Sequence, residues 1–416
     1  MGPITLFDKS FLQSLNVDES IWFDHFFICN IAPLFYVETL ADLQKAIGSG
    51  RTQEQEVGRI AEKTPVLHSM PNVFHFAICV ANLLGYPVAM DGRVHVAGGR
   101  PVRTNKQSGI VIDETPEAKA FSRWQNGEFW EVERDFARIW RNMIALMNFD
   151  TILKKLVSLG INPANCRTLY DAKQIADSAV SESVKQFKLL ELVFLLFNIP
   201  EQLSKKILQR WLLLGYPTLK SFAPYALYLL TVEIFFYVAL ATGLISRTKV
   251  TNKIDLAYLY YLPFCMIFTS SDRFHRHCAP LFLRDDQEFV WGIDLKQDLK
   301  KINAYYDKLP ESEKEKGLYA IAPDPPRDED FLICRLWDQF LPGWRSEKEP
   351  SIPMTKDVEN HLIEHVKGFT KAKTISQNQV DFDLSNPDAM VIQRRVPMKR
   401  SKWWQLPKDL KIKNED

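Results

Sequence analysis

The chain has 416 residues, of which 46% are hydrophobic and 25% charged, and its net charge is +1. It is long enough for two or three domains and has the composition of a globular protein with a large core. The near-zero net charge excludes any inference about nucleic acid from bulk charge, so only local clusters of charged residues bear on the partners of this protein.

The start of the chain and its cysteines bear on the cellular compartment. The first eight residues lack a basic segment and reach an acidic residue before an apolar stretch forms, so we expect no secretory signal. The six cysteines show no Cys-x-x-Cys spacing, which predicts reduced and mostly buried thiols. These observations predict a cytoplasmic protein.

The first part of the chain alternates between strand and helix patterns. The apolar run Ile4–Phe7 predicts a buried strand that ends at Asp8, and the apolar positions between Ser10 and Phe26 predict a helix. A second apolar run over 28–35 predicts another strand, and an amphipathic helix is expected to open at Tyr36. This alternation predicts an α/β domain with a parallel sheet.

The pattern changes over residues 49–216, where helices dominate. The clearest helical stripe covers 117–147, with Gly127 as a point where it can divide in two. The stretch before it, 91–109, carries glycines and arginines and predicts a hairpin or loop. We expect this region to be a large, mainly helical insertion that offers a surface for a protein partner.

Residues 224–245 form an apolar segment about as long as a membrane span. Two interpretations fit, a membrane span and a central helix that is apolar on all sides. Glu233 is costly at the centre of a bilayer without a partner. If the segment is a core helix instead, the carboxylate of Glu233 needs a hydrogen-bond partner inside the protein.

Strand and helix alternate again towards residue 300. Residues 255–262 predict a helix, and the run 264–268 predicts a third strand that ends in the polar step 269–272. A further helix is expected from Arg273, and Glu288–Trp291 predicts a fourth strand. An amphipathic helix should follow it, which completes a second α/β stretch.

The last part of the chain, 301–416, predicts a C-terminal extension with a charged, proline-rich connector and a basic tail. Cations attract phosphates and indole rings stack on bases, so the tail offers a nucleic-acid contact. An equally good interpretation is that its tryptophans dock on the protein's own surface. The tail residues considered as nucleic-acid contacts are Arg400, Lys402, Trp403 and Trp404.

Three acidic residues occupy similar positions along the chain. Asp8 follows the first strand, Glu38 lies in the first turn of the helix after the second strand, and Asp272 follows the third strand. The carboxyl ends of parallel strands share one edge of a sheet, where ligands bind. Asp255 begins a helix and is expected to come from the opposite edge unless that helix is long or angled. Each acid alone is also explained as a helix cap.

Four clustered carboxylates would raise one another's pKa, and Mg²⁺ or Mn²⁺ is the cation whose oxygen-ligand preference suits them. Two such ions, roughly 3.5–4 Å apart, can clamp the attacking and leaving oxygens of a phosphodiester. The sequence has no phosphate-binding loop, dinucleotide fingerprint or Ser-His-Asp order that would suggest other chemistry.

Four stretches carry a combined pattern: 6–10 (LFDKS), 35–43 (FYVETLADL), 255–259 (DLAYL) and 264–272 (FCMIFTSSD). Together they resemble the PIN-like nucleases. That family has an acid that ends the first strand, an acid that opens the second helix, an acid that starts a later helix, and a hydrophobic strand that closes on a Thr/Ser-x-Asp step.

The resemblance implies an α/β fold with a PIN-like parallel-sheet core over 1–48 and 217–300, interrupted by the helical insertion 49–216. More than half of the chain separates the second acid from the third, which is far more than a compact PIN-like domain needs. The resemblance implies a metal-dependent nuclease, with single-stranded RNA favoured over DNA and a toxin or phage-defence setting, all by analogy.

The resemblance also implies roles for individual residues, with the acids holding Mg²⁺ or Mn²⁺ and two hydroxyls orienting ligands or water. The expected catalytic and metal-binding residues are Asp8, Glu38, Asp255 and Asp272, with Ser10 and Ser270 beside them. We expect Arg273 and His275, which follow the last acid, to contact substrate phosphate. The spacing of His275 and Cys278 fits no usual zinc site.

Two rival interpretations remain. One is a non-catalytic PIN-like scaffold, in which the acids cap helices and the insertion binds a protein. The other is a membrane-anchored protein with a span at 224–245. Such a span would place Asp8 and Glu38 on the opposite side of the membrane from the later acids, so a shared metal site implies no membrane partner.

Overall fold

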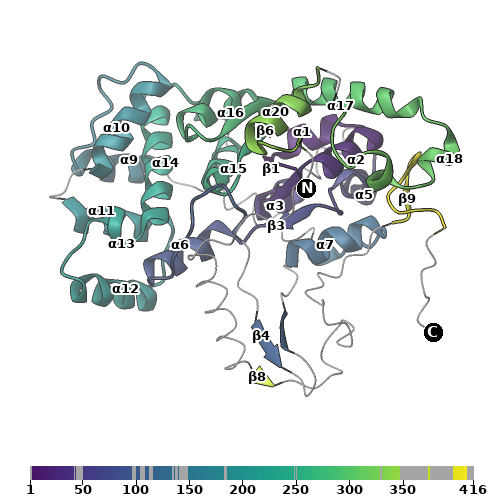
Figure 1. Ribbon diagram of the computed structural model, residues 1–416. Coiled ribbons are helices and arrows are strands. Elements are labelled where there is room, and N and C mark those ends of the chain that lie inside the picture. Colours follow the sequence, from purple (N-terminus) through teal and green to yellow (C-terminus); the bar gives the residue numbers. More distant parts are fainter. Residues whose placement is uncertain are drawn as a thin grey trace.

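The molecule is built around a five-stranded parallel sheet, in the spatial order β3-β2-β1-β6-β7 (Figure 1). The strands are β1 (Ile4–Phe7), β2 (Ile28–Ile31), β3 (Ser69–Pro71), β6 (Ile267–Ser270) and β7 (Glu288–Trp291). Central β1 pairs with β2 through Leu6 and Asn30 and with β6 through Leu6 and Phe268. The predicted α/β fold with a parallel sheet is therefore confirmed, and the carboxyl ends of all five strands share one edge.

The computed structural model describes residues 2–41, 43, 50–95, 100–103, 108–111, 116–133, 135, 139, 149–181, 185–247, 249, 251–327, 330–346, 373–374 and 397–409. Part of the predicted helical stripe over 117–147 and most of the polar end after residue 350 lie outside these residues.

The sheet separates two hydrophobic layers, because successive side chains of a strand point to opposite faces. Leu6 and Phe268 belong to one layer, which we call the α14 layer, and Phe7 and Ile267 belong to the other, the α2 layer. The helices of the α14 layer are α6 (His75–Leu83), α9 (Phe149–Ser158), α10 (Leu169–Ser181), α11 (Gln186–Leu196), α12 (Glu201–Leu213), α13 (Leu219–Phe222), α14 (Pro224–Ala241), α15 (Asn252–Tyr258) and α16 (Arg273–Cys278).

The α2 layer covers the other face of the sheet. Its helices are α1 (Lys9–Ser14), α2 (Val17–Phe26), α3 (Pro33–Ala41), α5 (Gln53–Lys63), α7 (Pro116–Gln125), α17 (Gly292–Asp307) and α20 (Leu332–Phe340), with the short α18 (Glu311–Lys314) and α19 (Leu318–Ile321) in the connector. Figure 1 shows α2 and α17 on one side of the sheet and the bundle of α9 to α14 on the other.

Several predicted boundaries move for local reasons. The helix expected from Ser10 to Phe26 divides in two, because Asn16 caps α2 by accepting from the amide of Glu19 at 2.7 Å while the Glu19 carboxylate accepts from the amide of Asn16 at 2.8 Å. The second strand ends at Ile31 because Pro33 is the first residue of α3. Glu38 therefore lies in the second turn of α3, and its expected place in the first turn is wrong.

Two further predicted elements differ from the structure. The third strand begins at Ile267, because the preceding residues Leu259–Phe264 form a 3-10 helix. Strand β3 lies inside 49–216, the range expected to be an insertion, yet it pairs with β2 and extends the central sheet. Of the hairpin or loop predicted over 91–109, the structure has a hairpin that extends to residue 111, formed by antiparallel β4 (Arg100–Arg103) and β5 (Ser108–Val111), with β8 (Lys373–Thr374) beside β4.

Helix α14 is the centre of its layer. Among the described residues it is the one helix long and apolar enough to cross a membrane by length and composition, and most of that length is buried inside the protein. Glu233, at its middle, is 2% exposed and accepts hydrogen bonds from Lys253 and from the hydroxyl of Tyr260. The prediction of a core helix with an internally hydrogen-bonded Glu233 is confirmed.

Candidate active site

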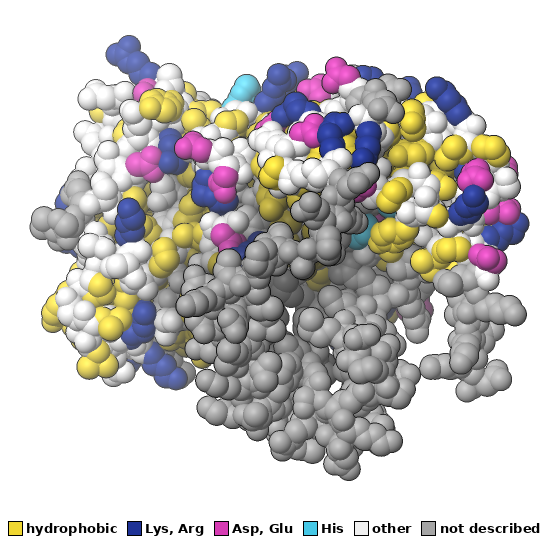
Figure 2. Space-filling view, in the orientation of Figure 1, with side chains coloured by type: hydrophobic (Ala, Val, Ile, Leu, Met, Phe, Trp, Pro, Cys, Tyr) yellow, Lys and Arg dark blue, Asp and Glu magenta, His cyan; other side chains and the backbone are white. Residues whose placement is uncertain are grey.

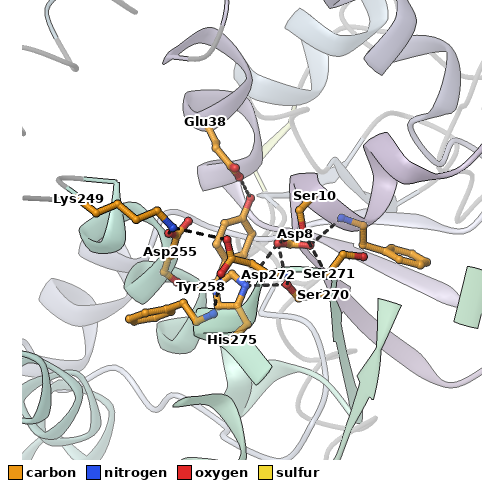
Figure 3. Close-up of polar contacts among 12 residues, drawn as sticks. Asp8, Ser10, Glu38, Lys249, Asp255, Tyr258, Ser270, Ser271, Asp272 and His275 are labelled. Atoms are coloured by element: carbon orange, nitrogen blue, oxygen red, sulfur yellow. Dashed lines mark hydrogen bonds and ion pairs between the residues drawn. The ribbon is translucent and has the colours of Figure 1, made fainter. Parts of the chain in front are cut away.

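Asp8 stands where β1 ends and α1 begins. As the N-cap of α1 it accepts a hydrogen bond from the amide of Phe11 at Oδ1, at 3.0 Å. At Oδ2 it accepts from the hydroxyl of Ser10 at 2.6 Å and from that of Ser270, at the end of β6, at 2.8 Å. The contacts predicted for Ser10 and Ser270 beside this acid are therefore present, and the adjacent ends of β1 and β6 are joined through one carboxylate (Figure 3).

His275, on α16, is fully buried beneath this carboxylate. Its Nδ1 lies 2.8 Å from Oγ of Ser270 and 3.4 Å from Oδ2 of Asp8, and its Nε2 lies 2.7 Å from the backbone carbonyl of Asp255. Burial lowers the pKa of His275, but the hydrogen bond and charge of Asp8 outweigh it and raise the pKa to about 9. The ring is an imidazolium at neutral pH, with both nitrogens donating.

The effect on Asp8 is reciprocal. Burial alone would raise the pKa of Asp8, but the hydrogen bond and charge of His275, with the Ser10 hydroxyl and the Phe11 amide, hold it below its ordinary value. Asp8 is thus the best compensated acid of the site. Its Oδ2 already accepts from two hydroxyls and lies 3.4 Å from the His275 ring, so Oδ1 is the oxygen with capacity for a further partner.

Asp272 and Asp255 face each other across one lysine. Asp272 caps α16 by accepting from the amide of Phe274 at 2.6 Å. Nζ of Lys249 lies 3.8 Å from Oδ2 of Asp272 and 3.6 Å from Oδ2 of Asp255. The Lys249 side chain is 53% exposed, so water screens this interaction. Burial, partly offset by His275 and reinforced by Asp272, raises the pKa of Asp255 to about 6.

Glu38 reaches the site from α3. Its Oε2 accepts a hydrogen bond from the hydroxyl of Tyr258, one turn after Asp255 on α15, at 2.7 Å. Burial raises the pKa of Glu38 to about 8; the charge of Lys9 opposes this shift and the charge of Asp8 adds to it. This carboxyl is therefore held largely in its neutral form at neutral pH.

The four predicted acids come together at the carboxyl edge of the sheet (Figure 3). The charges of Asp272 and Asp8 raise the pKa of Asp255, and the charges of Asp8 and Asp255 raise the pKa of Glu38. The expectation that Asp255 comes from the opposite edge is wrong. A helix that leads into a parallel strand runs antiparallel to it, so the first turn of α15 lies where the neighbouring strands end.

The possible ligands are carboxylate oxygens, which are the ligands that hard cations prefer. The positive side chains near them do not balance their negative charge. As the side chains stand, no group of three or more His, Cys, Asp or Glu among the described residues is close enough to hold one ion. Lys249 occupies the space between two of the acids, and Tyr258 holds the third. The residues fit Mg²⁺ or Mn²⁺ by chemistry, and a cation would draw them closer together.

Arg273 and His275, which follow Asp272, differ in their exposure to solvent. Arg273 is exposed at the start of α16, where a substrate phosphate could reach it. His275 is buried, so its expected contact with substrate phosphate is wrong, and it binds Asp8 and Ser270 instead. The sequence signal was limited to spacing: His275 and Tyr258 each lie three residues after an acid, which places them near the site but does not identify their partners.

The basic tail docks on the protein. Trp403, in β10 (Trp403–Trp404) beside β9 (Lys399–Arg400), is fully buried, and its Nε1 donates to Asn303 at 2.9 Å. Its ring lies 4.8 Å from that of Trp22. Because Trp403 is buried, its interpretation as a base-stacking residue is wrong. The alternative of docking on the protein's own surface is the one that the structure supports.

The other tail residues are also engaged with the protein. Arg400 is 9% exposed and lies 3.6 Å from the carboxylate of Asp24. Lys402 pairs with Asp307 at 2.7 Å. Trp404 lies beneath the ammonium groups of Lys399 and Lys408. Their expected nucleic-acid contacts therefore compete with contacts that fix the tail.

No protein-family model matches this chain, and neither curated proteins nor solved structures include a significant match. Its function therefore has to be inferred from the geometry and electrostatics of the sheet edge, together with the sequence motifs.

Proposed function

We propose that this chain is a divalent-metal-dependent nuclease that hydrolyses phosphodiester bonds at the carboxyl edge of its central sheet. The observation that carries the proposal is the grouping of four acids at this edge, where Lys249 lies between Asp255 and Asp272 and burial raises the pKa of Glu38 and Asp255. Both carboxyls are drawn out of water, and the charges of Lys9 on Glu38 and of His275 on Asp255 only partly offset that cost. A bound divalent ion is the partner that would favour their ionised forms.

The acids would hold Mg²⁺ or Mn²⁺, which when bound supplies an activated water and neutralises charge on the phosphate. Asp255 and Asp272 are the first ligands in this proposal, because Lys249 already marks the place between them where a positive charge lies. His275 and Ser270 keep Asp8 ionised and fixed at the end of β1. Exposed Arg273 would contact the substrate phosphate.

The finer parts of the proposal rest on the sequence motifs. The resemblance to PIN-like nucleases favours single-stranded RNA as substrate and endonucleolytic cleavage, and a cytoplasmic toxin or defence effector as the setting. The helical insertion 49–216 is the proposed surface for a regulating protein partner.

A non-catalytic scaffold is the second candidate, and one observation favours it. Asp8 and Asp272 both cap helices, accepting from the amides of Phe11 and Phe274, and a cap needs no catalytic role. Glu38 and Asp255 have no such capping bond, so they distinguish the two candidates.

The test compares cleavage of single-stranded RNA by the full chain with Mn²⁺, with Mg²⁺ and with a chelator. We expect metal-dependent cleavage that Asp255→Asn and Glu38→Gln abolish, because each removes one negative charge with little change in shape. The control is Asp294→Asn, which alters an exposed acid in the first turn of α17 and should leave cleavage unchanged. Cleavage that survives both site variants contradicts the proposal, and a wild type inactive with either metal favours the scaffold.

A further inference from the structure

The turn between α12 and α13 exposes an unusual run of apolar side chains. All five residues from 212 to 216 are exposed, and Leu213 is 87% exposed. The other exposed large hydrophobic side chains among the described residues, such as Val157, have no exposed large hydrophobic residue directly next to them in the sequence, which is normal for a protein surface. We call Leu212, Leu213, Leu214 and Tyr216, with the nearby Lys206 and Lys220, the α12 tip.

The backbone holds this tip in a defined conformation. Gly215 has φ +74°, and Tyr216 follows it with φ +60°, a left-handed conformation that is strained for a bulky residue. The Tyr216 amide donates to the carbonyl of Trp211 at 3.2 Å, and Nε1 of buried Trp211 donates to the carbonyl of Pro217 at 2.8 Å. The backbone is therefore strained at a residue whose aromatic ring is exposed to solvent. Such strain is often found at functional sites, which suggests a function for this surface.

The tip lies in a positively charged part of the chain. Residues 205–222 contain four cations and no acidic residue, although Lys205 pairs with Glu201 at 2.7 Å. Lys206 and Lys220 are exposed, whereas Arg210 turns inward and donates to the carbonyl of Leu83. Figure 2 shows hydrophobic and basic side chains next to each other over α12, at the lower left of the molecule.

We propose that the α12 tip docks peripherally on an anionic lipid bilayer. Leucines that enter the headgroup boundary, a tyrosine at the interface and lysines that meet negative headgroups are the combination such a contact requires. Nucleic acid would use the lysines but not three aliphatic side chains. Protein interfaces favour tyrosine but are depleted in lysine, so a bilayer fits the whole set best.

This contact differs from a membrane span. The expectation of no membrane partner rested on assigning 224–245 to the core, and α14 is indeed buried. The α12 tip lies at the surface of the α14 layer and would touch a bilayer without crossing it. The proposal does not depend on the nuclease activity proposed above.

The test is co-sedimentation of the full chain with vesicles of phosphatidylcholine alone and of phosphatidylcholine mixed with phosphatidylserine. We expect binding to the anionic vesicles that weakens as salt is raised. The double variant Leu213→Ser/Leu214→Ser should lose at least about tenfold in affinity. The double variant Lys206→Gln/Lys220→Gln should lose a similar factor in affinity for anionic vesicles, because each lysine near such a surface contributes about fivefold to affinity. Its affinity for vesicles of phosphatidylcholine alone should not change.

Matched controls alter the same residue types elsewhere, Val157→Ser on α9 and Lys316→Gln in the connector, and both should bind as the wild type does. Circular dichroism confirms that each variant is folded. Absence of binding to anionic vesicles, or equal binding by the double leucine variant, overturns the proposal. Concentration-dependent dimerisation that the leucine variant abolishes would assign the tip to a second copy of the chain and overturn it as well.

Discussion

Glu233 in the α14 layer and Glu38 at the sheet edge are both largely withdrawn from water, but the groups that stabilise their carboxyls differ. Glu233 accepts hydrogen bonds from Lys253 and Tyr260, so a cation and a hydroxyl share one buried carboxylate. Glu38 accepts from the hydroxyl of Tyr258, and its pKa is raised to about 8. The first acid is satisfied by the fold as it stands, whereas the second is satisfied only by a proton or a further cation.

The same contrast holds for the two lysines near α15. Lys253 is 14% exposed and contacts a buried carboxylate, while Lys249 is 53% exposed and lies between two acids at ion-pair distance. Buried and fully paired charges act as structural contacts, and incompletely paired acids in one cluster are typical of functional sites. The difference is consistent with a structural role for Glu233 and supports the ligand binding proposed for the sheet edge.

The largest expected effect is on Lys253→Met, which leaves the Glu233 carboxylate buried without its cation. We expect the free energy of unfolding to fall by about 3–5 kcal/mol, measured by urea denaturation. The matched control is Lys249→Met, the same substitution at the exposed lysine, which should change stability by less than about 1 kcal/mol. Equal losses in the two variants would remove the contrast between the regions.

A second prediction concerns Asp8→Asn. The sequence alone predicts that losing one of four like charges raises thermal stability. The contacts of Asp8 with His275 and Ser270 reverse that expectation, because the amide cannot accept the charged hydrogen bond as strongly. We expect a loss of about 1–3 kcal/mol without metal. Asp255→Asn, whose carboxyl has a raised pKa, should instead gain stability, and thermal unfolding of both compares them directly.

The third prediction is a pH dependence. Because the pKa of Glu38 is above its ordinary value, the folded chain binds this proton more tightly than the unfolded chain. Its contribution to the free energy of unfolding therefore falls as pH rises from about 4.5 to about 8. Glu38→Gln lacks this titration, so at about pH 8 the metal-free variant should be more stable than wild type by at least about 1 kcal/mol.

Part of the pH slope should remain in Glu38→Gln. The pKa of His275 is raised from 6.5 to about 9, so its stabilising effect is complete below 6.5 and is lost as pH rises through 9. Urea unfolding across this pH range separates the two groups. Identical slopes in wild type and Glu38→Gln would mean that Glu38 is already ionised in the folded chain.

The smallest expected effect is on Asp272→Asn. An asparagine oxygen can still accept from the amide of Phe274 and caps a helix nearly as well as aspartate, so stability should change by less than about 0.5 kcal/mol. Cleavage should nevertheless be lost, since the charge next to Lys249 and Asp255 is gone. A folded variant with full activity would reduce Asp272 to a helix cap.

Much of the fold around the site could be predicted because it is built from local patterns. Strands β1 and β7 could be predicted because each is a short apolar run next to an acidic residue. The same pattern predicted that Asp8 and Asp272 lie at strand ends. β3 was missed because three residues, ending in a proline, carry no alternation to recognise. Partners far apart in sequence were missed for the same reason, since no local pattern joins Trp403 to Trp22.

The candidate site was predicted as a set of acids but not as a set of contacts. Nothing in the sequence distinguished Asp8, whose charge His275 compensates, from Glu38, whose carboxylate accepts from Tyr258 and whose pKa stays raised despite the charge of Lys9. That distinction depends on which side chains the fold buries together. The burial of particular side chains together decides whether neutralising an acid should raise or lower the stability of the protein.

The most direct test of the central claim is isothermal titration calorimetry of the metal-free chain with Mn²⁺. We expect one or two ions to bind, with affinity at least about tenfold weaker in Asp255→Asn and Glu38→Gln. Asp294→Asn should bind as the wild type does, and Lys249→Met should bind at least as tightly, because its ammonium no longer competes with the cation. Absence of stoichiometric binding, or equal affinity in wild type and both site variants, would contradict a metal site at the sheet edge.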